Sequence, residues 1–306
     1  MIKNINKKTF ALILIIVSMA FLFSACSKKQ SAAKIKYIRQ IEQWHKKRIA
    51  NLKKENGWLN LVGLFWLKEG TNKFGSDKSN DIIFPEGTPK FIGYFILNNG
   101  NVKVKINNGL NVKNDDKIIH ETELKNDLSG NPTILSYKSF RWFIIKRSDR
   151  YGVRLRNLEA PLVKNFKGID YYPINPEWKV QAIFEKYQDP KILYIPTIIG
   201  TVEKDTSYGI LKFRLNGKEY HLNPIEEDNR FFVIFADKTS GVETYGGGRF
   251  LYVPKPASSG KTVIDFNKAY NPPCAFTKFA TCPLPPKDNY LKLEITAGEK
   301  NYGHGH

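Results

Sequence analysis

The residues best suited to chemistry lie in and beside a proline-rich segment near the C-terminus. Pro272, Pro273 and a second proline cluster at 283–286 restrict the backbone of this segment. A restricted loop can hold polar side chains in a fixed geometry. The polar side chains of this region form a predicted site for a small polar or anionic ligand: Arg249, Asp265, Asn267, Tyr270, Asn271 and Glu299.

Arg249 decides between two interpretations of this set. Its guanidinium group can anchor an anionic ligand, or it can form a structural ion pair with a carboxylate. In the second case the other polar groups would only satisfy the hydrogen bonds of the loop backbone. The sequence leaves both interpretations open.

A hydrolase-like enzyme is a second functional hypothesis, with Asp265 or Glu299 as a general acid or base. The sequence holds neither a Gly-x-Ser-x-Gly nor a His-Glu-x-x-His motif. Catalytic residues, cofactors and enzymatic activity itself therefore stay undetermined. A third hypothesis is a structural or partner-binding module without a pocket.

Cys274 and Cys282 flank a short stretch of the same proline-rich segment. They can be buried thiols, or they can form a disulfide in an oxidising compartment. As weak candidates for metal binding or catalysis they would need partners, and His221 is the most central histidine. No metal site is predicted beyond these two weak candidates.

Arginines are concentrated in one predicted hairpin, and Arg154 and Arg156 fall on the same side of a strand because side chains alternate with a period of two. This face can bind an anion or can be an ordinary solvated surface. The arginines are Arg141, Arg147, Arg150, Arg154 and Arg156.

The first 25 residues have the features of a bacterial lipoprotein signal peptide. Lys3, Lys7 and Lys8 precede an apolar run at 10–23, which is shorter than the roughly 20 residues of a membrane-spanning helix. Small residues then precede Cys26, the predicted lipidation site. An ordinary signal peptide or an uncleaved anchor is the alternative.

The predicted lipoprotein would be attached to a membrane through Cys26, with residues 26–34 as a tether. We expect it in the cell envelope, facing the periplasm or the exterior. The leader holds three of the 48 basic residues and none of the 29 acidic ones, so the net charge falls from +19 to +16 on its removal. A basic protein adheres to anionic surfaces. The lysines are spread along the chain, however, and the predicted envelope location excludes nucleic acid as a partner.

The elements that must position these residues are mainly strands. Apolar residues spaced near 3.6 predict one amphipathic helix at 35–56. Short alternating runs follow, and Asn99-Gly100 and Asn216-Gly217 indicate hairpin turns. We therefore predict a mainly β fold with an N-terminal helix and two packed sandwich- or barrel-like modules. The N-terminal module is 57–165 and the C-terminal module is 166–303, with Pro161, Gly168, Pro173 and Pro176 at the boundary.

Residues 75–85 resemble a strand-turn-strand stretch of forkhead-associated domains, which are β-sandwiches that bind phosphothreonine. Ser76 stands where that family has its phosphate-binding arginine, and no Ser-Arg-x-x-His element occurs around 88–90. The resemblance implies a sandwich-like turn in the N-terminal module without the phosphopeptide chemistry.

Several motifs resemble the bacterial and archaeal family DUF1684, a domain of unknown function. They are Gly57-Trp58-Leu59 with 63–67, Thr244 to Leu251 with its Gly-Gly-Gly-Arg, the segment 265–277, Ala280 to Pro286, and Ala297-Gly298-Glu299-Lys300. The resemblance spans roughly residues 40–302. It implies one coherent unit, and it implies no activity, because the family has none established.

Overall fold

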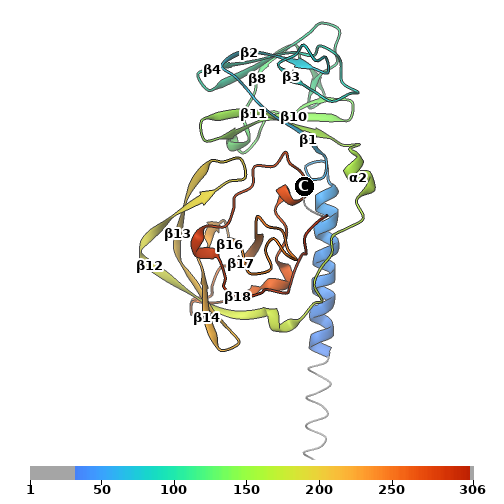
Figure 1. Cartoon of the computed structure of the whole chain (residues 1–306). Coiled ribbons are helices and arrows are strands. Elements are labelled where there is room, and N and C mark those ends of the chain that lie inside the picture. The colour runs from blue at the N-terminus through green and yellow to red at the C-terminus, as the bar shows by residue number, and fades with distance from the viewer. Residues whose placement is uncertain (1–31, 304–306) are drawn as a thin grey trace, which may run out of the picture.

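The computed structural model describes residues 32–303 of the chain. Strands dominate, and a single long helix precedes them, so the predicted mainly β fold with an N-terminal helix is confirmed. The strands of the N-terminal module gather at one end of the molecule (Figure 1). The helix runs beside the sheets of the C-terminal module and ends next to the N-terminal strands (Figure 1). The predicted signal peptide, Cys26 and most of the tether lie outside the described residues.

The helix extends from residue 32, where the description begins, to residue 53. Its apolar side is buried against the body of the protein, with Ile41 and Leu52 at most 1% exposed. The spacing of these residues explains why the helix forms here, since most helical stability in proteins comes from packing one apolar face. No helix among the described residues is long and apolar enough to cross a membrane.

The N-terminal module contains two sheets around one aromatic core. The five-stranded sheet has the order β3 (Ile82–Ile83), β2 (Gly70–Gly75), β4 (Gly93–Asn98), β5 (Asn101–Ile106) and β8 (Glu121–Glu123). The six-stranded sheet has the order β1 (Leu61–Trp66), β11 (Arg150–Asn157), β10 (Phe140–Arg147), β9 (Leu135–Tyr137), β6 (Lys113–Asn114) and β7 (Lys117–Ile118). Phe74, Phe95 and Trp142 are buried in the core, as is typical of two sheets whose strands alternate between core and solvent.

The C-terminal module contains a four-stranded and a three-stranded sheet around a second core. The first has the order β14 (Lys218–Leu222), β13 (Val202–Leu215), β12 (Lys179–Pro196) and β18 (Lys261–Asp265). The second has the order β15 (Ile225–Glu227), β16 (Arg230–Phe235) and β17 (Arg249–Pro254). β12 and β13 form one long hairpin, which is prominent in Figure 1.

The two predicted Asn-Gly turns are present. Asn99-Gly100 joins β4 to β5 and Asn216-Gly217 joins β13 to β14. All four residues have φ between 47° and 83°. A two-residue hairpin turn with positive φ at both positions matches the twist of its strands, and Asn and Gly tolerate this conformation best.

Short helical turns and loops connect the two modules, and they also form the segment after β18. The short helix α2 (Pro161–Asn165) stands between the modules. Phe166 and Ile169 then pack with Leu52 of the long helix and Phe276 of the proline-rich segment. This small third core fixes the helix against both modules. The remaining elements are 3-10 turns: Asp127–Ser129, Pro176–Trp178, Phe266–Lys268, Pro273–Ala275 and Lys287–Asn289.

Candidate functional site

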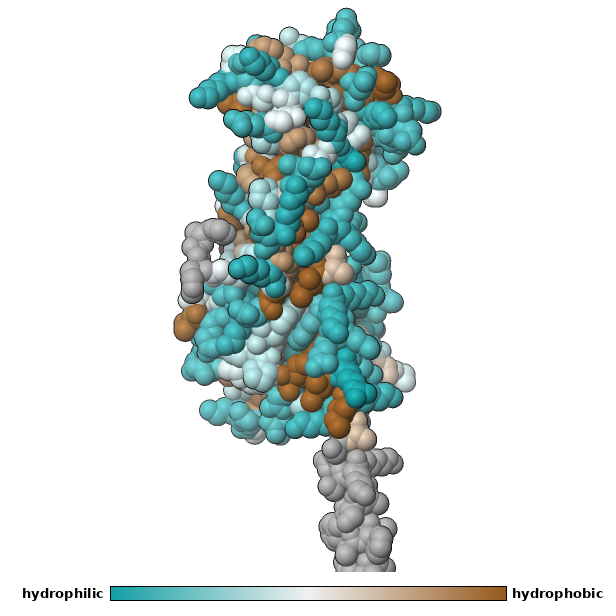
Figure 2. All heavy atoms as spheres, turned by 90° about the vertical axis from the view of Figure 1, so that its right-hand side faces the viewer, coloured by the Kyte–Doolittle hydropathy of each residue, from teal (hydrophilic) through white to brown (hydrophobic). Residues whose placement is uncertain are grey.

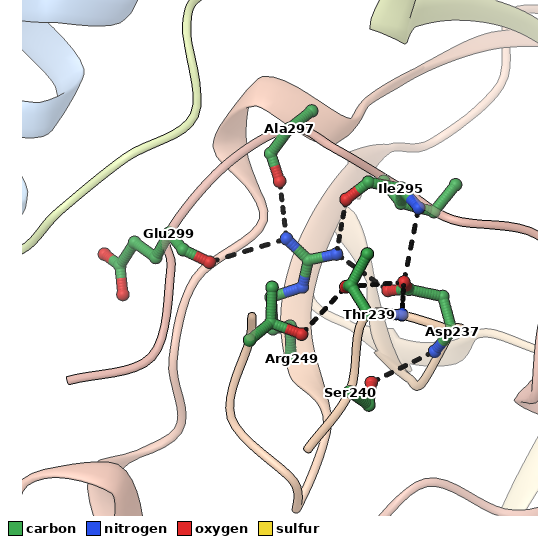
Figure 3. Close-up of polar contacts among 8 residues, drawn as sticks. Asp237, Thr239, Ser240, Arg249, Ile295, Ala297 and Glu299 are labelled. Carbon is green, nitrogen blue, oxygen red and sulfur yellow. Dashed lines mark hydrogen bonds and ion pairs between the residues drawn. The ribbon is translucent and has the colours of Figure 1, made fainter. Parts of the chain in front are cut away.

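Arg249 is completely buried and pairs with Asp237, a residue that the sequence interpretation did not include. Its Nη2 lies 2.7 Å from Asp237 Oδ2, and both side chains have 0% exposure. The guanidinium also donates to the backbone carbonyls of Ile295 and Ala297 (Figure 3). The geometry therefore corresponds to the structural ion pair and places Arg249 away from solvent.

The Asp237 carboxylate is saturated by further donors. Its Oδ1 accepts from the backbone and the hydroxyl of Thr239 at 2.8 and 2.6 Å, and from the backbone of Ile295 at 3.2 Å. This network ties the segment 295–299 to β17 and to the loop after β16 (Figure 3). Gly248, just before Arg249, has φ +80° and a Cβ there would lie 2.4 Å from Pro285. Only glycine allows the proline-rich segment to approach the ion pair so closely.

Asp265 and Asn267 form a second group, with a tyrosine of the helix. The Tyr37 hydroxyl donates to Asp265 Oδ1 at 2.7 Å, and Asn267 donates to the Tyr37 oxygen at 2.9 Å. Asn267 also exchanges hydrogen bonds with the backbone of Asn175. Burial, and next the Asp265 carboxylate, raise the pKa of Tyr37 far above its usual value, so its hydroxyl stays protonated and donates. This group holds the start of the helix against the C-terminal module.

Tyr270, Asn271 and Glu299 form a third group, which centres on Arg48 of the helix. Arg48 Nε lies 3.1 Å from Glu299 Oε1, and Glu299 Oε2 accepts from the Asn271 backbone at 2.7 Å. Arg48 Nη2 donates to the Asn271 carbonyl at 2.8 Å. The guanidinium lies over the Tyr270 ring, 4.7 Å from its centre. Arg48 is thus held by an ion pair, a carbonyl and an aromatic face.

Glu299 connects the Arg48 group to the Arg249 group. Its carboxylate pairs with Arg48, whereas its backbone carbonyl faces Arg249, and the two ends point apart in Figure 3. Glu299 is 0% exposed. Burial raises the pKa of Glu299, and the positive charge of Arg48 opposes that shift. A buried carboxylate that receives such donors acts here by positioning Arg48.

A pocket of about 440 Å³ opens where the helix faces the β16–β17 sheet. Its walls are aromatic and include Trp44, Phe250, Tyr252 and Tyr270. The lining contains two cations, Lys47 and Arg48, and no carboxylate. Burial raises the pKa of both Tyr252 and Tyr270, so their hydroxyls remain neutral. The pocket can therefore receive an anionic group together with an apolar or aromatic body.

The predicted site residues thus lie in three groups, and Tyr270 is the one that lines this pocket. Asp265 and Glu299 are buried carboxylates that do not line it. Sequence reasoning missed Arg48, as it missed Asp237 and Tyr37. Arg48 lies on the buried side of the helix, four residues after Trp44 and four before Leu52, which is the spacing of the apolar stripe. The sequence offered one signal for Arg48: it is a charged residue at a position that the helical periodicity marks as buried.

Cys274 and Cys282 are free thiols in the structure. The backbone N–H of Cys274 donates to Cys282 Sγ at 3.1 Å, so the two residues are in contact. The hydrogen bond from Cys282 lowers the pKa of Cys274, whereas burial raises that of Cys282. His221 is exposed on β14. Within residues 32–303 no group of three or more His, Cys, Asp or Glu side chains is placed to hold a metal ion.

The described chain is thus a mainly β protein with an aromatic, cationic pocket between a helix and a sheet. Residues 164–300 match the model of the family described as protein of unknown function, DUF1684. This match is shorter than the expected span of 40–302. The helix that supplies Arg48 and the Gly57-Trp58-Leu59 motif lie outside it.

A similar solved structure is the solution NMR structure of the uncharacterized protein from gene locus rrnAC0354 of Haloarcula marismortui. That protein is 29% identical over a match that covers 46% of this chain and 80% of the other, with a TM-score of 0.39. No curated protein matches the sequence.

Proposed function

We propose that this protein binds a small anionic ligand with an apolar or aromatic body in the pocket between the helix and the β16–β17 sheet. The observation that carries the proposal is Arg48, which lines the pocket and is held by Glu299, Asn271 and Tyr270. An arginine fixed before the ligand arrives loses little side-chain entropy on binding.

The charges around the pocket favour an anion. Nε and Nη2 of Arg48 are engaged, and among the described residues no hydrogen bond involves Nη1. Lys47 adds a second positive charge to the lining. Glu299 neutralises part of the Arg48 charge from the buried side, where it does not line the pocket. A planar guanidinium with a free edge is suited to a carboxylate or phosphate.

The size and walls of the pocket favour a ligand with one ring or a short apolar chain. A volume of about 440 Å³ lies in the range of small-molecule sites, roughly 300–1,000 Å³. Phe250 and Tyr270 meet edge to face, with ring centres 5.8 Å apart, and they form a rigid wall. We therefore place the anionic group at Arg48 and the apolar body against these rings.

The test is a calorimetric titration of the full chain with phenyl phosphate and, as the neutral control with the same ring, phenol. We expect a complex with phenyl phosphate that weakens as salt concentration rises, because the main contact is ionic. Phenol should bind at least roughly tenfold more weakly, since it carries no negative charge to pair with Arg48. Equal affinity for both compounds, or no binding of either, would contradict an anion site.

The place of action that we propose is the cell envelope, with the protein attached to a membrane through lipidated Cys26. The proposal rests on the basic and apolar segments of the leader and on the small residues before Cys26. A diacylated N-terminus adds two chains, which suffice for stable anchoring. Nucleic acid is not proposed as a partner.

Cys26→Ser should move the protein out of the membrane fraction or block its processing. The matched control is Cys274→Ser, which removes a thiol from the folded body and leaves the leader unchanged. Cell fractionation, with the intact mass of the mature protein, reports both effects. A Cys26→Ser protein that stays in the membrane fraction at the mass of the wild type would rule out lipidation at this residue.

A further inference from the structure

A second pocket lies where the residues just after the helix meet β10 and β11. It has a volume of about 590 Å³. Its apolar surface includes Ile134 and Phe143, and Arg141 and Arg156 also line it. Most of the helix-bearing side of the molecule is hydrophilic, with separate apolar patches (Figure 2). This pocket has both charged and apolar walls. It belongs to neither the Arg48 site nor the Arg249 ion pair.

Two arginines of β11 are buried without a carboxylate in direct contact, and one of them, Arg156, lines this pocket. Arg154 is 4% exposed and Arg156 is 8% exposed, so the solvated-face interpretation of the sequence is wrong for both. The carbonyl of Gly57 and Oδ1 of Asn60 accept from Nη1 of Arg156, and Thr281 accepts from Arg154. All three acceptors are neutral.

No carboxylate among the described residues lies within 4.0 Å of Arg154 or Arg156, in contrast to Arg147 and Arg249. Asp127 acts on Arg154, and Glu55 on Arg156, only at longer range. Burial lowers the pKa of both residues to about 10, which still leaves them charged at neutral pH. Nε of Arg154 is buried without any hydrogen-bond partner. A buried positive charge without a counter-charge is costly unless something neutralises it.

The lining of the second pocket is positive overall. Lys54, Arg141 and Arg156 face it, and Glu55 is the single carboxylate. Glu55 pairs with Arg141 Nε at 2.9 Å, but its side chain is 63% exposed and can turn to solvent. Among the described residues, Nε and Nη2 of Arg156 and Nη2 of Arg141 form no hydrogen bond, so each guanidinium retains free donors.

We propose that this second pocket binds an oxyanion, a carboxylate or a phosphate, carried on an apolar group, with Arg141 and Arg156 as its ligands. The anion supplies Arg156 with the directly contacting negative charge that the protein does not provide. Phe143, whose ring already faces Arg156 at 5.7 Å, and Ile134 contact the apolar group. The site is independent of the Arg48 pocket, so either can exist without the other.

The experiment is a calorimetric titration of the full chain that carries Asn51→Trp. Asn51 is exposed and lines the first pocket, so the larger side chain fills that pocket. Phenyl phosphate, benzoate and phenol are the probes. We expect one equivalent of phenyl phosphate or benzoate to bind. The probe with the higher affinity shows whether the site prefers a phosphate or a carboxylate. Phenol should bind at least roughly tenfold more weakly.

Three further changes in the Asn51→Trp chain locate the binding. Ile134→Trp should abolish it by filling the pocket, and Arg141→Gln should weaken it roughly tenfold or more. Glu55→Gln should tighten it severalfold because it removes the only opposing charge. These positions are exposed or partly exposed, so the fold does not depend on them.

Absence of anion binding in the Asn51→Trp chain would overturn the second site, and binding by the wild type would then still support the Arg48 site. The second site would also be overturned if, in the Asn51→Trp chain, binding persisted after Ile134→Trp. The same holds if neither Arg141→Gln nor Glu55→Gln changed the affinity. If instead Ile134→Trp alone abolished all binding by the wild type, the Arg48 site would fail and the second site would stand.

Discussion

Arg249→Met should lower the free energy of unfolding by about 3–5 kcal/mol, the cost of breaking a buried ion pair by removal of one partner. The change leaves the Asp237 carboxylate buried, with 0% of its side chain exposed, and without its counter-charge. It also removes the donor that holds the carbonyls of Ile295 and Ala297. Urea-induced unfolding followed by tryptophan fluorescence measures the loss.

Two controls separate the ion pair from the loss of an arginine as such. Arg214→Met removes an arginine that is 75% exposed and lies 3.6 Å from Glu219, so it should cost less than about 1 kcal/mol. The double variant Arg249→Met/Asp237→Leu removes both charges and should recover much of the stability. If Arg249→Met preserved stability but abolished binding of phenyl phosphate, Arg249 would be a ligand-binding residue after all.

Arg48→Gln should weaken the binding of phenyl phosphate roughly 10- to 150-fold, which corresponds to about 1.5–3 kcal/mol for a hydrogen bond to a charged group. Arg48→Lys keeps the charge but loses the planar guanidinium group, so we expect an intermediate loss. The titration is made in the Ile134→Trp chain, in which the second pocket is filled.

Glu299 complicates the interpretation of Arg48→Gln, because the single change leaves a buried carboxylate unpaired. The double variant Arg48→Gln/Glu299→Gln removes both charges and should still bind weakly if Arg48 contacts the ligand. Arg39→Gln, on an exposed position of the same helix, should leave the affinity unchanged. Recovery of wild-type affinity by the double variant would mean that Arg48 acts only through the fold.

Local patterns in the sequence predict much of the fold. The apolar stripe of the helix and the two Asn-Gly turns depend on neighbouring residues, so the sequence alone reveals them. The pairing of distant strands does not follow from such patterns. β1 pairs with β11, so Leu61 faces Arg156 across 95 positions of the chain, and the buried position of Arg156 results from that pairing. The alternation of side chains along the strand places Arg154 and Arg156 on one face, but it does not show whether that face is buried or exposed to solvent.

The site could be predicted only in part, for the same reason. The polar residues of the proline-rich segment were recognised, but their partners come from elsewhere: Tyr37 and Arg48 from the helix and Asp237 from the loop after β16. Tyr37 and Asp265 are 228 positions apart. Arg48 follows Lys46 and Lys47, and a run of three basic residues is typical of a solvated helix face. The helical spacing from Trp44 and Leu52 marks its position as buried, but only tertiary packing shows which residues Arg48 contacts.

The most direct test of the anion site is a crystal structure of the protein with bound phenyl phosphate. The account predicts that phosphate oxygens lie within hydrogen-bond distance of the Arg48 guanidinium, and that the phenyl ring contacts Phe250 and Tyr270. A complex in which no bound phosphate contacts Arg48, whether or not the second pocket is occupied, would contradict the central claim.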